Sequence, residues 1–161
     1  MLKNYCRMVV PALLFALLTT PLSARDNPAV YQLQSNQQQL EVWQFMQLAT
    51  AEDLSTEKLL GDISAGRFVP LTADKLNRGV TDKPFWLRLT LQNPTTEAID
   101  WVLSHETPYI DVINIHAREP GGDWQQTLLT DWQPFHSRPL HYRNLAYPAT
   151  TKAGGQTELL I

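Results

Sequence analysis

The stretch 85–93 alternates apolar and polar side chains at the two-residue period of a β-strand. Its leucines and Phe85 share one face, which needs a hydrophobic core. The other face carries an indole, a guanidinium, a hydroxyl and an amide, from Trp86, Arg88, Thr90 and Gln92. That face either meets water or meets a polar ligand. We expect Asn93-Pro94 to end the strand, because proline lacks the N–H that a ladder requires and Asn favours turns.

Similar short apolar patterns recur along the chain, separated by turn residues. They predict strands at 40–48, 67–71, 99–104, 110–117, 124–129, 141–148 and 157–161. The first of these is irregular, since Trp43 and Phe45 interrupt its apolar face. Pro120-Gly121-Gly122-Asp123 predicts a hairpin, and Gly154-Gly155 predicts a turn before the last strand. Residues 130–139 contain two prolines and no alternation, so we expect an ordered loop there.

One helix is predicted, over Ser55–Gly61. Ser55 is a suitable N-cap, Glu57 lies in the first turn, and Gly61 closes the segment. Seven or eight short strands with frequent turns and one early helix indicate an all-β fold. We therefore expect an antiparallel jelly-roll-like β-sandwich with one short N-terminal helix.

The N-terminus has the pattern of a secretory signal peptide. Lys3 and Arg7 precede the apolar run 8–18, and small residues follow as far as Ala24. The run is shorter than the roughly 20 residues of a membrane-spanning helix, so export is favoured over an uncleaved anchor. We expect a signal peptide over residues 1–24 and a periplasmic location for the rest.

The exported part is expected to be a single domain. Residues 25–39 are rich in Gln and Asn and predict a flexible lead-in, while 40–161 suffice for one core. Cys6 is the only cysteine and lies within the signal, which excludes a disulfide, a thiolate metal site and a cysteine nucleophile from the exported part. The formal charge of that part is about −5 without any basic run, so nucleic acid and anionic lipid surfaces are poor partners.

Catalytic and metal-binding patterns are lacking in the sequence. It has no Gly-x-Ser-x-Gly, no phosphate-binding Gly-rich loop and no His-Glu-x-x-His. The four histidines are scattered and would need the fold to gather three of them for zinc. No acidic pair is selected by its spacing for glycoside hydrolysis. We therefore expect no enzyme, no metal and no cofactor in this chain.

A group of arginines, acidic residues and aromatic rings in the second half is the strongest candidate for binding. Guanidinium forks and aromatic faces together recognise sugars, carboxylates and phosphates. The candidate ligand-binding residues are Arg88, Asp111, Trp132, Arg138, His141 and Arg143. In the alternative interpretation, Arg88 and Arg143 pair with Asp111 or Asp131 and hold the 130–139 loop. Trp86 and Trp101 are expected to pack in the interior, as strand aromatics usually do.

The order of several segments resembles a known family. These segments are 54–60, 68–71, 76–81, 86–93, 110–115, 134–139 and Arg143-Asn144. Over about 40–161 the chain resembles the second type of extracellular domain of bacterial seven-transmembrane receptors with diverse intracellular signalling modules. One departure is His116, where the family pattern leads us to expect an aromatic residue.

This resemblance implies a periplasmic jelly-roll-like domain, similar to carbohydrate-binding modules. Such domains feed a membrane bundle and a cytoplasmic cyclase or kinase module. No membrane spans follow within this sequence, so we expect a chain truncated at its C-terminus relative to an intact receptor.

Two functions follow as expectations. The first is a sensor input domain that binds a small polar ligand, with carbohydrate as the favoured class, and passes the signal to downstream membrane segments. The second is a protein-interaction module that dimerises or binds a partner and has no small-molecule pocket. They differ in whether Arg88, Arg138 and Arg143 converge on a concave site or are used inside the fold.

Overall fold

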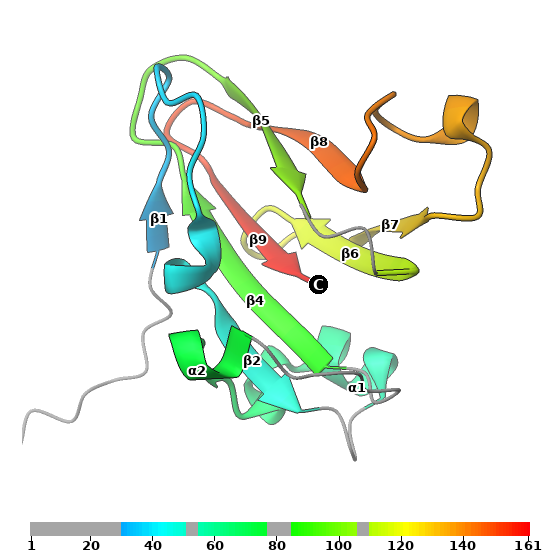
Figure 1. The fold of residues 1–161 in the computed structure, drawn as a ribbon. Coiled ribbons are helices and arrows are strands. Elements are labelled where there is room, and N and C mark those ends of the chain that lie inside the picture. The colour runs from blue at the N-terminus through cyan, green and yellow to red at the C-terminus, as the bar shows by residue number, and fades with distance from the viewer. Residues whose placement is uncertain (1–29, 51–54, 77–84, 106–109) are drawn as a thin grey trace, which may run out of the picture.

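The computed structural model describes residues 30–50, 55–76, 85–105 and 110–161, which form two stacked β-sheets (Figure 1). The larger sheet contains β1 (Val30–Gln32), β2 (Gln47–Thr50), β3 (Val69–Pro70), β4 (Phe85–Gln92), β6 (Val112–Arg118), β7 (Gln125–Thr130) and β9 (Gln156–Leu160). The smaller sheet contains β5 (Ile99–Ser104) and β8 (Ala146–Thr151). The helical elements are α1 (Thr56–Gly61), α2 (Ala73–Leu76) and the 3-10 helices η1 (Val42–Phe45), η2 (Ile63–Gly66) and η3 (Phe135–Ser137).

Strand β4 lies at the centre of the larger sheet, whose order is β3-β2-β4-β9-β6-β7. One edge of β4 pairs with β9. Its other edge pairs first with β2 and then with β1. All strand pairs are antiparallel except β1–β4, which is parallel. The expected all-β, antiparallel, sandwich-like fold is confirmed.

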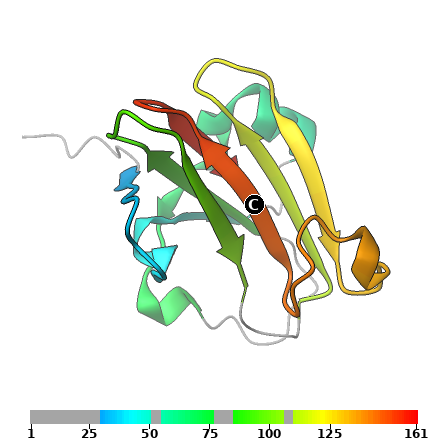
Figure 2. The same ribbon diagram turned by 90° about the horizontal axis from the view of Figure 1, so that it is seen from above.

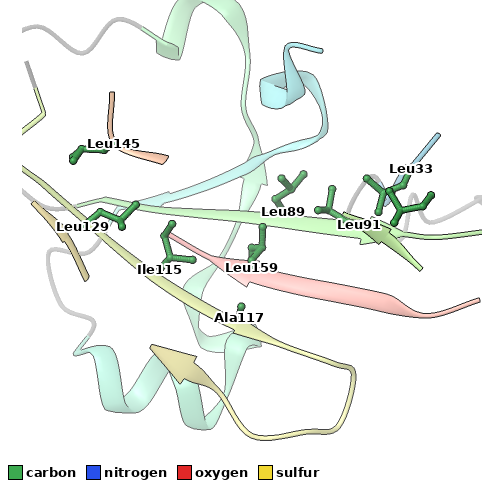
Figure 3. Close-up of a cluster of buried hydrophobic side chains, with 9 residues drawn as sticks. Leu33, Leu89, Leu91, Ile115, Ala117, Leu129, Leu145 and Leu159 are labelled. Atoms are coloured by element: carbon green, nitrogen blue, oxygen red, sulfur yellow. The ribbon is translucent and has the colours of Figure 1, made fainter. Parts of the chain in front are cut away.

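The main core lies between the two sheets (Figure 3). Leu89 and Leu91 of β4 point into it together with Ile115, Leu129 and Leu159 from neighbouring strands. The smaller sheet closes the core from above with Ile99, and Trp101, Leu103 and Tyr147 pack around it. Because alternate residues of a strand point to opposite faces, the leucine pattern of β4 predicts this core correctly.

The outer face of the larger sheet is covered in part by α1 and η2, on the side opposite to β5 and β8 (Figure 1). Leu59 of α1 is fully buried, and it belongs to a second apolar cluster with Ala49, Trp86 and Leu160. Trp124 donates its indole N–H to the Leu60 carbonyl over 3.0 Å, which fixes the end of α1 to the sheet. The face of β4 that carries Trp86 therefore packs in part against a helix. The sequence interpretation, in which this face meets either water or a polar ligand, did not include that possibility.

Several local predictions are confirmed. Helix α1 has Ser55 as its N-cap, whose Oγ accepts from the Lys58 N–H over 3.3 Å, although Asp62 rather than Gly61 is its C-cap. The turn after β6 contains Gly121 at φ +76°, a conformation that suits glycine. Strand β3 lies at the edge of the sheet, where its proline is tolerated.

Other predictions are wrong in detail. The segment 40–48 is not one strand, because η1 precedes β2 and turns Phe45 onto the Tyr31 ring, with centroids 4.9 Å apart. Residues 141–145 lie outside β8, since the Arg138 side chain binds carbonyl groups of this segment. Helix α2 is a second short helix that the sequence does not predict. Strand β1 orders part of the 25–39 stretch by pairing with β4, and the expected signal peptide lies outside the described residues.

Candidate functional site

The six candidate residues fall into two separate places. Arg88 is half-buried on the outer face of β4, whereas the other five lie in or beside the long loop between β7 and β8. Across the sheet, Arg88 is in line with Leu160, His116 and Gln126, so three strand spacings separate it from β7. Strand β7 continues for four residues beyond Gln126 before the loop begins. Arg88 is therefore about 20 Å from the start of the loop. The structure therefore does not bring Arg88 together with Arg138 and Arg143.

Arg138 organises the β7–β8 loop. Its Nη1 donates to the carbonyls of Tyr142 and Arg143 over 3.4 and 3.1 Å, and Nη2 donates to the Asp131 carbonyl over 3.2 Å. These bonds tie the two ends of the loop together through main-chain oxygens. In the described parts of the chain, neither Arg88 nor Arg143 forms an ion pair with Asp111 or Asp131. The alternative interpretation is therefore wrong in its ion pairs, and the arginine whose side chain ties the loop together is Arg138.

The same loop lies at one side of the molecule (Figure 2), and several of its large apolar side chains are exposed. The exposed large residues are Trp132, Phe135, Leu140 and Tyr142, and the most exposed is Trp132, at 65%. Asp111 contributes its carbonyl, which accepts from the Asp131 N–H over 3.2 Å, and its side chain is exposed. His141 contacts the His136 carbonyl over 3.2 Å through Nε2. Arg143 is exposed beside these groups.

A groove of about 320 Å³ lies beside β5, between that strand and the segment that leads from β1 to η1. Its lining combines aromatic rings, glutamine amides and core side chains. The lining residues are Tyr31, Leu33, Gln34, Gln37, Gln38, Gln39, Leu40, Val42, Leu89, Leu91, Ile99, Asp100, Trp101, Val102 and Leu103. The only charged side chain among them is Asp100, and the volume is in the range of small-molecule sites.

The groove has a fixed aromatic wall. The indole N–H of Trp101 donates to Thr151 Oγ1 over 2.9 Å, and its ring meets Tyr147 edge-on with centroids 6.0 Å apart. Tyr31 donates its hydroxyl to the Gln37 side-chain carbonyl. Aromatic faces bind the C–H surfaces of polar ligands, while amides exchange hydrogen bonds with hydroxyl groups. This arrangement fits an uncharged polyhydroxylated molecule.

Sequence reasoning missed the groove. Its signal was the glutamine run 37–39, which we interpreted as part of a flexible lead-in. Trp101 was correctly expected to pack in the interior, but the same ring also lines the groove. The site forms only because β1 pairs with β4 and brings the glutamines against β5, which lies more than sixty residues further along the chain.

A third polar region is the part of the outer sheet face that surrounds Arg88. Buried side-chain atoms without a hydrogen-bond partner gather there: Gln47 Oε1, Trp86 Nε1, Arg88 Nε, Thr90 Oγ1 and His116 Nε2. A buried polar group left unpaired costs about 1–3 kcal/mol, so five on one face are unusual. Burial lowers the pKa of the Arg88 guanidinium, and the nearby Glu158 opposes that shift. Burial also lowers the pKa of His116.

Metal chemistry finds no support in the described ranges, which hold no group of three or more His, Cys, Asp or Glu residues suited to an ion. Within the same ranges, no helix is long and apolar enough to cross a membrane.

These features define a sandwich-like β domain with a ligand-sized groove. The model of the 7TMR-DISM extracellular 2 family matches residues 45–161, and the chain belongs to this family. The family consists of extracellular domains of receptors, so the chain is an extracytoplasmic receptor domain with an input role. The resemblance drawn from the sequence is confirmed. No curated protein and no solved structure matches the chain.

Proposed function

We propose that this domain is the periplasmic ligand sensor of a transmembrane receptor and that it binds a small polar molecule of the carbohydrate class. The observation that carries the proposal is the groove beside β5, where aromatic walls, glutamine amides and an apolar floor meet. The family supports the input role, because its members are extracellular receptor domains. The domain itself performs no catalysis in this proposal.

Binding uses fit and hydrogen bonding. The apolar face of a sugar ring lies against Trp101 and Tyr31, and the amides of Gln34 and Gln38 bind its hydroxyl groups. Because the groove lies between β5 and the β1–η1 segment, a ligand that contacts both favours arrangements in which they are close. Such differential binding shifts the populations of the conformations of the domain. This shift is then passed to the downstream membrane segments.

The β7–β8 loop provides a second location for the same ligand class. Trp132 offers an exposed ring, and Arg143 and His141 are exposed polar side chains of the same loop. Arg138 positions these groups through the main chain, and Asp111 anchors the start of the loop. The groove is the better site, because it is concave and its Trp101 wall is already fixed.

A thermal-shift screen of mono- and oligosaccharides on the purified protein tests the proposal. A ligand that binds only the folded state raises the melting temperature in a saturable way. We expect this rise to disappear in the double variant Gln34→Ala/Gln38→Ala, whose substitutions lie at the surface and spare the fold. The matched loop variant Trp132→Ala should keep it.

The opposite pattern, with the rise lost only in Trp132→Ala, would place the ligand in the loop. No rise with any saccharide up to millimolar concentration would reject the sensing of carbohydrates by this domain.

The exposed aromatic loop favours a second function, that of a protein-interaction or dimerisation module. Contiguous exposed apolar side chains often mark protein interfaces, and four of them lie in this loop: Trp132, Phe135, Leu140 and Tyr142. Light scattering on the purified protein measures its oligomeric state directly. A dimer that Trp132→Ala converts to a monomer, together with no saccharide response, supports the second function over the first.

A further inference from the structure

The outer face of β4 carries a guanidinium that the fold does not neutralise. Arg88 lies directly opposite Gln47 of β2, and Thr90 follows two residues later on the same face. Arg88 Nε, Gln47 Oε1 and Thr90 Oγ1 are all buried without a hydrogen-bond partner. Gln47 and Thr90 are only 5% and 2% exposed, so both side chains are buried in this face of the sheet.

Within the described part of the chain, the neighbouring charged side chains form no hydrogen bond or ion pair with Arg88. Glu158 lies opposite Thr90, but its carboxylate accepts from Arg118 Nε over 2.7 Å. Arg118 is held in that position by the Trp124 ring, with its guanidinium carbon 4.2 Å from the ring centroid. Among the described residues, one acidic and two basic groups therefore share this region, which leaves one positive charge in excess. Arginine forks of this kind pair with oxyanions through two parallel N–H bonds.

We propose that the outer face of the larger sheet binds the oxyanion group of a small ligand, a carboxylate or a phosphate, through Arg88. Arg88 supplies the charge, and the terminal N–H groups of its guanidinium bind the oxyanion. Gln47 lies opposite Arg88 on the adjacent strand. Since Arg88 is only half-buried, the oxyanion approaches it from solvent.

This site is separate from the carbohydrate groove. Leu89 and Leu91, which line the groove, point to the opposite face of β4. The groove lining contains no basic residue, whereas the Arg88 face has positive charge in excess. The two sites take ligands of different charge on opposite sides of one strand, so the failure of either proposal leaves the other standing.

The test is a titration of the purified protein with acetate and, separately, with inorganic phosphate at constant ionic strength. The arginine Nε–H signals are followed by NMR, and the Arg88 signal is assigned by its loss in Arg88→Lys. We expect a saturable shift of that signal with at least one of the two anions. The anion that binds more tightly identifies the preferred oxyanion. Arg88→Lys, which keeps the charge but not the fork, should weaken binding about tenfold or more.

Arg67→Lys is the matched control, because it makes the same substitution at an exposed position outside the strands. It should bind both anions as the wild type does. No saturable shift of any arginine Nε–H signal with either anion overturns the proposal, and this outcome needs no variant. Equal weakening by Arg67→Lys and Arg88→Lys overturns it as well, since binding would then not depend on which arginine is changed.

Discussion

Leu89 and Arg88 are neighbours in β4, yet they face environments of opposite character. The leucine side is closed by a second sheet, and Leu89 and Leu91 belong to the main apolar cluster there. The arginine side is closed in part by α1, and beside that cover it holds several buried polar atoms without partners. The first face is arranged for stability, whereas the second retains polar groups at a cost to stability.

The comparison shows how one strand serves two purposes. Strand alternation separates the two sets of side chains completely, so changes on one face leave the other in place. Binding chemistry can therefore vary on the outer face and at the groove rim without loss of the core. The following predictions test this division, beginning with the largest expected effect.

Leu159→Ala should destabilise the protein by about 2–5 kcal/mol, since it opens a cavity in the inner core where Leu159 is fully buried. Urea unfolding followed by circular dichroism measures the loss. Val102→Ala on β5 is the control, because Val102 is 52% exposed and the change should stay within about 0.5 kcal/mol. Equal losses in the two variants would show that the inner face is not the core.

Trp124→Phe should cost about 1–2 kcal/mol, because it removes the hydrogen bond to the Leu60 carbonyl and weakens the Arg118 stack. Hydrogen exchange should rise in α1, where the Leu59 N–H bonds to the Ser55 carbonyl. Trp132→Phe in the exposed loop is the control and should change neither quantity. Unchanged exchange in α1 would mean that Trp124 does not hold the helix on the sheet.

Ser55→Ala should cost about 1 kcal/mol, since the N-cap oxygen that accepts from the Lys58 N–H is lost. The Lys58 amide should exchange faster, while amides of the inner core should keep their protection. Ser104→Ala, at an exposed position of β5, is the control. An unaltered exchange rate at Lys58 contradicts the cap.

His116 should make stability depend on pH in one direction. Burial lowers its pKa below the ordinary value of 6.5, so the unfolded chain binds a proton more readily than the folded one. The contribution of neutral His116 to the free energy of unfolding is fully present above pH 6.5 and is lost as the pH falls through the pKa of the folded state. The difference in unfolding free energy between the wild type and His116→Gln, measured at several pH values, should therefore shift against the wild type on acidification. A difference independent of pH would contradict the burial effect.

The sequence predicts well those features that local signals determine. The cap at Ser55, the glycine turn after β6 and the alternation of β4 each need only a few neighbouring residues. The position of Arg88 relative to Arg138 depends instead on sheet order, since β9 and β6 lie between β4 and β7. No local pattern encodes that order, and the six candidate residues were therefore grouped without regard to their separation.

The groove illustrates the same limit. Glutamines in a polar stretch resemble a flexible segment until β1 pairs with β4 and places them next to Trp101. The unpaired atoms around Arg88 likewise depend on burial by several elements. A polar strand face in the sequence indicates where such a site can form, but not whether its groups find partners within the fold.

The five tryptophan indole N–H signals provide the most direct test of carbohydrate sensing in the groove. They report on separate regions: Trp101 on the groove, Trp132 on the loop, and Trp86 and Trp124 on the outer sheet face. During titration with a saccharide that raises the melting temperature, we predict a saturable shift of the Trp101 signal while Trp132 stays in place. A shift of Trp132 with Trp101 unmoved would contradict the assignment of the groove as the sensor site.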